Sequence, residues 1–429
     1  MAVTPVRPVP RDSEGGKRRE GGDGSAGAGE DYGRHFEDFD KGLRDAVDDA
    51  LNVSSWTSGE RMGELEERLI RNVRLAVENE TEMAPRVMQT VRDNVKDAKD
   101  ASRESGIYSV TPEQISATLG NVLFNGLVEA CDGTRVTYDT LPISVIQIGI
   151  CMSSYLGDGE PISLGHRLFR HDIVRDNGNP ADEVLAFIQQ RERKSRSNEM
   201  GEMSGISDMM VRAIMGYGER FLLTEKSTKP WRMGHGTPMP YEMMTGSGSG
   251  KIIQASLDLL PKLLAGHKKF VFVPSDTSNA AIKTIANALR PLQYAVLTNT
   301  EYVINGYTKY LDEGNLSDSY RGQYRNFRPK LKAFTKEVAS KVLIGVYKAS
   351  HFSPGNIFYA HEDHVHEAAL IAIADSALQE HRGFPNLIDI ADRLCRGTFE
   401  PSGIAASVNA VFAEKGEPFR YLLERSTRA

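Results

Sequence analysis

The sequence of 429 residues has few cysteines, no long apolar run and no surplus of positive charge. Its longest apolar runs, residues 143–152 and 368–374, are shorter than the roughly 20 residues that a membrane-spanning helix needs. The cysteines are Cys131, Cys151 and Cys395, and they lie among apolar neighbours without CxxC spacing. We therefore expect buried, reduced thiols in a cytoplasmic protein without membrane helices, and no disulfide framework.

The first 35 residues are rich in glycine, proline and mixed charge and have almost no large apolar side chains. They contain no apolar core of the kind found in a secretion signal. Such a segment cannot bury enough surface to offset the entropy cost of ordering. The sequence predicts a disordered tail over residues 1–35.

The formal net charge is −6, from 52 lysines and arginines against 58 aspartates and glutamates. Proteins that coat duplex DNA without sequence preference usually carry a basic excess, because neutralising phosphates drives that binding. The balance argues against a histone-like binder. It leaves a nuclease open, because an acidic metal site offsets a local basic groove.

Residues 36–108 carry apolar side chains at helical spacing with strongly charged residues between them, which predicts an amphipathic helical arm. Apolar segments separated by turn residues then alternate with helical patterns over residues 109–429, which predicts an α/β domain with a mixed central sheet flanked by helices. The expected strands are residues 126–131, 143–155, 163–173, 220–223, 269–273 and 341–347. The expected helices are residues 180–217, 252–264, 365–379 and 387–395.

The most informative segment is Ala-Cys-Asp-Gly-Thr at residues 130–134. An apolar strand ends in Asp132, where a carboxylate is held rigidly and can bind a divalent cation. Two further acids, Asp208 on a helix and Glu225 after the expected strand 220–223, are predicted to converge on it. Carboxylate oxygens are the ligands that Mg²⁺ and Mn²⁺ prefer. An ordinary Asp-Gly turn and a solvated acidic helix face are the alternatives.

These motifs resemble those of the NurA nuclease family, in the same order along residues 110–425. Residues 130–134 are similar to its first motif, and Asp208 and Glu225 to its second and third acids. Residues 342–350, with Lys348, are similar to its late strand, and residues 383–392 to its last motif. The resemblance implies an RNase H-like core, DNA-end processing in repair or antiviral defence with a HerA-type hexameric ATPase, a homodimer, and Mn²⁺ or Mg²⁺ as cofactor.

The sequence departs from the family at three positions of these motifs. The third acid is Glu225 where the family usually has Asp, Phe384 replaces a tyrosine, and Asp392 replaces a histidine. We expect Asp392 to join Asp132, Asp208 and Glu225 as a catalytic metal ligand. The same departures motivate an alternative, a non-catalytic adaptor subunit that binds DNA or the ATPase.

The segment 226–241 is rich in lysine, arginine, tryptophan, histidine and proline. Its Lys229, Trp231, Arg232 and His235 are predicted, with Lys348, to hold DNA by phosphate contact and base stacking. A buried structural loop is the alternative. Residues 320–336 alternate basic and aromatic side chains, which is typical of a groove that follows a nucleic-acid backbone or of a solvated helix with a packed aromatic face.

Two other patterns favour different chemistry. His361, His364 and His366 could bind Zn²⁺ in a zinc-dependent hydrolase, although their spacing matches neither a His-Glu-x-x-His motif nor a zinc finger. The segment Thr245–Lys251 has Thr245 where a phosphate-binding loop needs glycine, and Ile252 where it needs serine or threonine. This segment predicts a glycine-rich turn that opens a helix.

Overall fold

The computed structural model describes residues 44, 47, 48, 50–56, 62–98, 100–139, 144–157, 162–169, 208–275, 279–313 and 318–418. The chain divides into two compact units, residues 1–78 and residues 79–429. The predicted tail and residues 170–207, which include most of the expected helix 180–217, lie outside the described residues. The domain boundaries at residues 35 and 108 therefore stay predictions.

The described part of the first unit is helical. It contains a short 3-10 turn, Val53–Ser55, and the first half of helix α2, Met62–Asn94. The apolar side chains that follow helical spacing on this half of α2 are exposed to solvent: Met62, Leu65, Leu69, Val73 and Val77. The predicted helix over these residues is confirmed.

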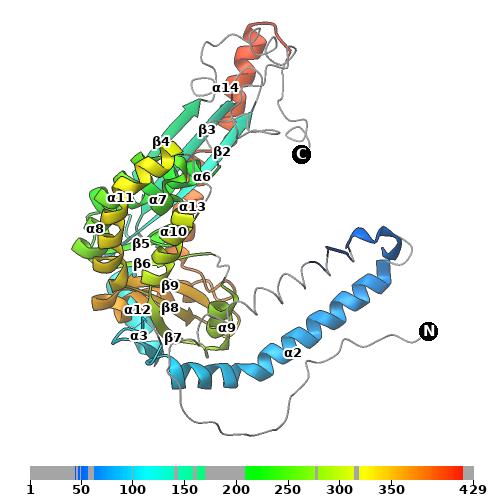
Figure 1. Ribbon diagram of the computed structural model, residues 1–429, viewed down its shortest axis with the longest axis vertical. Coiled ribbons are helices and arrows are strands. Elements are labelled where there is room, and N and C mark those ends of the chain that lie inside the picture. The colour runs from blue at the N-terminus through cyan, green and yellow to red at the C-terminus, as the bar shows by residue number, and fades with distance from the viewer. Residues whose placement is uncertain are drawn as a thin grey trace. The chain divides into compact units, whose positions relative to one another are not determined.

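In the second unit, nine strands of the described chain form one mixed sheet in the order β1-β7-β8-β9-β6-β5-β2-β3-β4 (Figure 1). β2 is parallel to β5 and β5 to β6, and the other neighbouring pairs are antiparallel. The strands are β1 (Gly106–Ser109), β2 (Val128–Asp139), β3 (Ser144–Ser153), β4 (Ile162–Phe169), β5 (Trp231–His235), β6 (Phe270–Val273), β7 (Gln293–Asn299), β8 (Val342–Lys348) and β9 (Asn356–His361).

The strands β4-β3-β2-β5-β6 form the core that positions the site. The first three along the chain make an antiparallel meander, and β5 and β6 then continue parallel to β2. This mixed sheet flanked by helices confirms the predicted fold class. Five of the expected strands are present, as β2, β3, β4, β6 and β8.

The predicted strand 220–223 is wrong. Helix α6, Asp208–Phe221, continues into a wide helical turn, Leu222–Lys226. Leu222 and Leu223 are fully buried, and they reach the core from the end of this helix rather than from a strand. The three consecutive apolar residues 221–223 suit a buried helix end as well as a strand, so periodicity could not separate the two.

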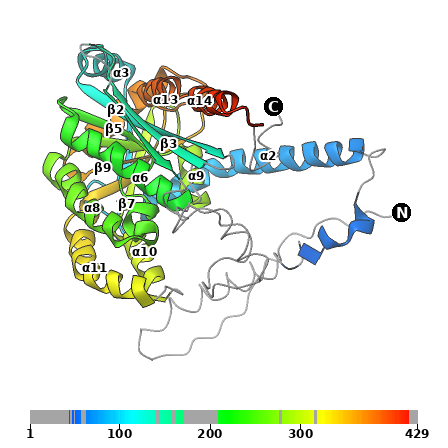
Figure 2. The same cartoon turned by 90° about the horizontal axis from the view of Figure 1, so that it is seen from above.

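Helices cover both faces of the sheet (Figure 2). Helices α6, α7, α8, α10 and α11 pack on one face around an apolar core that includes Ile148 and Phe270, and α3, α12 and α13 pack on the other around Met233 and Phe358. None of the helices in the described ranges is long and apolar enough to cross a bilayer. These helices are α3 (Pro112–Thr118), α7 (Tyr241–Thr245), α8 (Gly250–Pro261), α9 (Ala280–Ala288), α10 (Glu301–Glu313), α11 (Asp318–Glu337), α12 (Val365–Ala377), α13 (Asn386–Thr398) and α14 (Pro401–Glu414).

Candidate active site

The site begins where the parallel pairing of β2 with β5 ends. The last paired residues are Cys131 and Gly234, so Asp132 and His235 follow them side by side. His235 ends β5, but β2 continues to Asp139, so Asp132 lies within its strand, opposite Cys151 of β3, and not at the predicted strand end. Nδ1 of His235 lies 3.1 Å from Oδ1 of Asp132, and the amide of Gly133 donates to the same oxygen at 2.8 Å. Asp132 is only 5% exposed. Within the described chain, the Asp132 carboxylate makes both of these hydrogen bonds through Oδ1. Its Oδ2 is therefore available to a ligand.

A second carboxylate, Glu219, reaches this point from helix α6. It is buried and forms an ion pair with its neighbour Arg220, which is buried as well. A Cβ atom on Gly133 would lie 2.6 Å from Oε1 of Glu219 and 2.8 Å from Cγ of Met215. A side chain at position 133 would therefore collide with the side chains of Glu219 and Met215 and displace them.

Burial and neighbouring charge shift the protonation of both groups. Burial, with the charge of Asp132, raises the pKa of Glu219 to about 7, although Arg220 opposes the shift. Burial alone would lower the pKa of His235, but the hydrogen bond to Asp132 and the charges of Asp132 and Glu219 outweigh it and raise that pKa. The site thus gathers two ionisable groups whose pKa values are both raised by their surroundings, and shifted pKa values are common at catalytic sites.

Asp132, Glu219 and His235 line a cavity of about 690 Å³ between α6 and α13. Open α/β sheets commonly bind ligands in such a crevice at the carboxyl ends of their strands. Arg220 fixes one wall, because its guanidinium donates to the backbone oxygens of His235 and Thr237. The other arginines that line the cavity are Arg212, Arg382 and Arg396.

The last predicted motif reaches the same cavity. Asp392, on α13, lines it and accepts a hydrogen bond from Nε of Arg396 at 2.8 Å. The ring of Phe384 packs edge-on against His235, with 5.7 Å between ring centroids. Asp389, which the sequence analysis did not select, also lines the cavity and is paired with Arg382. The structure therefore brings Asp392 and Phe384 together with Asp132.

The structure does not bring Asp208 or Glu225 to Asp132. Asp208 is exposed at the start of α6, where Arg135 and Arg212 bind its carboxylate, and the bond with Arg135 is the main reason that its pKa is lowered. Glu225 ends the helical extension of α6 and binds Nζ of Lys262 at 2.8 Å. The expected convergence depended on a strand at residues 220–223, and a helix there carries Glu225 away from the cavity.

Of the five residues predicted to contact DNA, one lines the cavity and four do not. His235 lines the cavity, but Trp231 and Arg232 are buried in β5. Trp231 belongs to the core packed under α12, and Arg232 donates to the backbone oxygens of Leu223 and Ser227, so neither is placed to contact DNA. Lys229 precedes β5 and does not line the cavity. The same holds for Lys348, which donates to the carbonyl of Asn287 at 3.1 Å.

The three histidines of the proposed zinc site have separate partners. Nδ1 of His361 accepts from the amide of Asp363, and Nδ1 of His364 lies 2.8 Å from Glu367. His366 lies between Tyr294 and Glu104, at 2.8 and 2.9 Å. Among the described residues, no group of three or more histidines, cysteines or acids is arranged to hold a metal. The zinc-site hypothesis does not fit this structure.

His361 makes the stability depend on pH. Its side chain is 1% exposed, and burial lowers its pKa from 6.5 to about 4. His361 therefore takes up a proton at a higher pH in the unfolded state than in the folded state. Its contribution to the free energy of unfolding is complete above pH 6.5 and is lost as the pH falls toward 4. We expect this group to change the free energy of unfolding by on the order of 3 kcal/mol over that window.

Thermal denaturation from pH 7 to pH 4 measures this dependence. His361→Asn keeps an acceptor for the Asp363 amide and cannot titrate, so its stability should fall less steeply than that of the wild type. His267 titrates in the same window, because burial lowers its pKa to about 4, so the slope is reduced rather than removed. Exposed His351→Asn is the control, and equal slopes in all three proteins would contradict the assignment.

The oxygen donors of the cavity fit a hard divalent cation. Asp132 and Glu219 supply two carboxylates. Oδ2 of Asp132 and Oε1 of Glu219 take no part in the hydrogen bonds and the ion pair described above. Mg²⁺ typically takes one or two protein carboxylates and completes its shell with water and substrate phosphate oxygens. Two carboxylates are therefore enough to bind such an ion together with water and substrate, although they do not surround it by themselves.

No protein-family model matches the chain, and no curated protein matches it either. Among solved structures, it is similar to the NurA nuclease from Sulfolobus solfataricus, with 10% identity, a TM-score of 0.42, and coverage of 84% of this chain and 98% of that one. It is also similar to NurA bound to dAMP and manganese, with 9% identity, a TM-score of 0.33, and coverage of 77% and 97%. Ciona intestinalis endonuclease V in complex with inosine-containing DNA matches with 13% identity, a TM-score of 0.26, and coverage of 63% and 84%. At these values the function has to be derived from the site itself.

Proposed function

We propose that this chain is a divalent-metal-dependent nuclease that hydrolyses phosphodiester bonds of DNA. The observation that carries the proposal is the meeting of Asp132, Glu219 and His235 in one cavity whose rim carries arginines. Two carboxylates beside an imidazole suit metal-assisted hydrolysis, and arginine is the side chain best matched to phosphate oxygens.

Each residue has a distinct part in this proposal. Asp132, through Oδ2, and Glu219, through Oε1, hold Mn²⁺ or Mg²⁺. When bound, such a cation supplies Lewis acidity to a phosphate oxygen and neutralises developing negative charge. His235 keeps Nδ1 on Asp132, so it exchanges protons with water or the leaving group through Nε2.

The arginines on the rim bind the substrate backbone. Arg212, Arg382 and Arg396 each pair with an acid, namely Asp208, Asp389 and Asp392. These pairs are partly exposed, and exposed ion pairs contribute little to stability, so a phosphate can exchange with a carboxylate at small cost. Asp392 then serves to hold Arg396 at the rim and adds negative charge opposite the two carboxylates.

A cleavage assay of the purified chain on linear and circular DNA tests the proposal. We expect cleavage with Mn²⁺ or Mg²⁺ and none with EDTA. Cleavage of linear DNA alone would indicate action at ends, and cleavage of both forms an endonuclease. An absence of cleavage with either metal, by protein shown to be folded, would favour the adaptor alternative.

The resemblance to NurA extends the proposal to partners. It implies that a HerA-type hexameric ATPase moves the DNA and that the nuclease works as a cytoplasmic homodimer, in repair or in antiviral defence. Co-elution of the chain with a HerA-type ATPase from the same genome, and stimulation of cleavage by ATP, test the ATPase partnership. Separate elution and unchanged cleavage would contradict it.

The homodimer gives a prediction about the exposed apolar side chains of α2. Leu65, Leu69 and Val73 are 40–55% exposed, so replacing them by glutamate leaves the packed core intact. If this stripe holds two copies together, the triple variant should be monomeric by light scattering while the wild type is dimeric. Arg71→Glu, off the stripe on the same helix, should stay dimeric. A triple variant with the wild-type mass would contradict the role of the stripe.

A further inference from the structure

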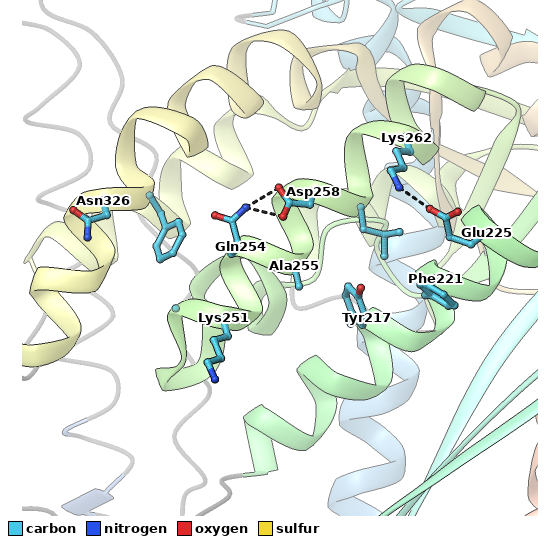
Figure 3. A pocket seen from close by; sticks show the side chains of 12 residues that line it. Tyr217, Phe221, Glu225, Lys251, Gln254, Ala255, Asp258, Lys262 and Asn326 are labelled. Carbon is cyan, nitrogen blue, oxygen red and sulfur yellow. Dashed lines mark hydrogen bonds and ion pairs between the residues drawn. The ribbon is translucent and has the colours of Figure 1, made fainter.

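A second cavity of about 630 Å³ lies behind the candidate active site, between α6, α8 and α11. Two of its lining side chains, Tyr217 and Phe221, come from the helix that carries Glu219 (Figure 3). They lie two residues before and two after Glu219, which at 3.6 residues per turn places them roughly 160° around the helix from it. The active-site cavity and this aromatic groove therefore occupy opposite faces of α6.

The aromatic groove offers ring faces to a ligand. The rings of Tyr217 and Phe221 are 6.3 Å apart and tilted by 32°, and both side chains are partly exposed. Phe327, on α11, contributes a third partly exposed ring. Aromatic side chains left at the surface of a groove are the usual platform for stacking the bases of single-stranded nucleic acid.

The acids that line the groove are already neutralised or hydrogen-bonded. Glu225 is paired with Lys262 at 2.8 Å, and Asp258 accepts two hydrogen bonds of 2.7 Å from the amide of Gln254. Figure 3 shows both pairs along α8 and the end of α6. Lys251 also lines the groove and adds a positive charge beside the rings. The aromatic part of the groove thus suits a neutral, planar group, with a phosphate nearby rather than on the rings.

Positive charge lies next to the groove, on α11. This helix lines the groove with Asn326 and Phe327, and Nζ of Lys330 ties it to Gln254 on α8 at 3.3 Å. Its sequence has six basic residues against two acids. The basic side chains that the structure shows as exposed are Arg325, Arg328, Lys330, Lys332 and Lys336. An apolar aromatic groove beside a basic helix matches the bases and phosphates of one nucleic-acid strand.

We propose that the aromatic groove binds unpaired bases of single-stranded DNA, with the phosphates following α11. The proposal rests on the proposed function for the identity of the ligand. It makes the groove an extended substrate site that favours a strand already separated from its complement.

Fluorescence anisotropy with a labelled single-stranded oligonucleotide tests the proposal, with the full chain and EDTA present so that no cleavage occurs. Tyr217→Leu/Phe221→Leu keeps apolar volume and removes the rings, so Kd should rise between about fivefold and 100-fold. Phe352→Leu, an exposed ring of the loop between β8 and β9, is the matched control and should bind like the wild type. Melting curves verify that each variant is folded.

Two further measurements separate base stacking from a general loss of DNA binding. An oligonucleotide without bases should bind the wild type more weakly, and the double variant, which keeps only the ring of Phe327, should distinguish it less from the normal one. Arg325→Gln/Lys332→Gln should lower the slope of log Kd against log salt by about 1.4, since each phosphate contact on a single strand contributes about 0.7.

Wild-type affinity in the folded Tyr217→Leu/Phe221→Leu variant would overturn the proposal and leave the groove to another partner, such as an apolar peptide. Failure of the wild type to bind single strands would overturn it too. Cleavage without ring-dependent binding would refute only the groove, whereas ring-dependent binding without cleavage would refute only the nuclease.

Discussion

Asp132→Asn should abolish DNA cleavage, with a loss of about 10³-fold or more, while the protein stays folded. The amide keeps the shape of the side chain, and its oxygen still accepts from the Gly133 amide. It loses the negative charge that would hold the cation, whose contribution to the transition state is several kcal/mol, or about tenfold in rate for each 1.4 kcal/mol. The measurement is the initial rate on labelled DNA with Mn²⁺.

Asp208→Asn is the matched control for this prediction. Asp208 is an acid of the same type, and the sequence motif selected it as a ligand, but it is exposed and bound by Arg135 and Arg212. We expect its variant to keep activity within about twofold of the wild type. If Asp208→Asn lost activity and Asp132→Asn kept it, the site would have to be moved to the start of α6.

The second large effect is stabilisation by metal. Without a cation, the buried carboxylates of Asp132 and Glu219 repel one another, and a cation that binds only the folded chain shifts the unfolding equilibrium. At 100 times its Kd it adds ~2.7 kcal/mol. For a domain the size of residues 79–429 that corresponds to a rise in Tm of about 4 °C. Melting curves with millimolar Mn²⁺ and with EDTA measure it.

Substitutions of the acids that line the cavity should differ in how much of the rise in Tm they remove. Glu219→Gln and Asp132→Asn should lose the rise in Tm, because each removes one of the two proposed ligands. Asp392→Asn should lose only a smaller part of it, because Asp392 faces the same cavity but is paired with Arg396. A full response to Mn²⁺ in Glu219→Gln would exclude it as a ligand. A complete loss in Asp392→Asn would place that carboxylate beside the other two.

The sequence predicted the part of the site that local pattern controls. Asp132 was selected because an apolar run followed by Asp-Gly is typical of a carboxylate at a strand end, although β2 in fact continues past it to Asp139. The final motif was found because residues 383–392 keep their spacing without a gap. Most of the expected strands were correct for the same reason, since alternating or continuous apolar runs bounded by turn residues are recognisable locally.

Glu219 was passed over because several acids lie near it and only the packing of α6 selects among them. One signal was present in the sequence. Val211, Met215, Glu219 and Leu223 follow one another at intervals of four, so Glu219 occupies the buried stripe of the helix. A charged side chain on an apolar stripe has to be paired or functional, because burial of an isolated charge is costly.

β5 was missed because its flanking prolines and glycines favour a loop, and the basic residues within it favour a surface. The strand exists because it lies between β2 and β6, where tertiary packing overrides local preference. The guanidinium of Arg232 is then satisfied by backbone oxygens rather than by phosphate. Such long-range pairing cannot be seen in a local window, and it also moved His235 from a predicted loop to the centre of the site.

Equilibrium binding of Mn²⁺, followed by the electron paramagnetic resonance signal of the free ion, tests the metal site most directly. The wild type and Asp208→Asn should each bind one or two ions per chain with the same affinity. Asp132→Asn and Glu219→Gln should bind them at least about tenfold more weakly. Equal binding by all four proteins, or none by the wild type, would contradict a metal centre formed by Asp132 and Glu219.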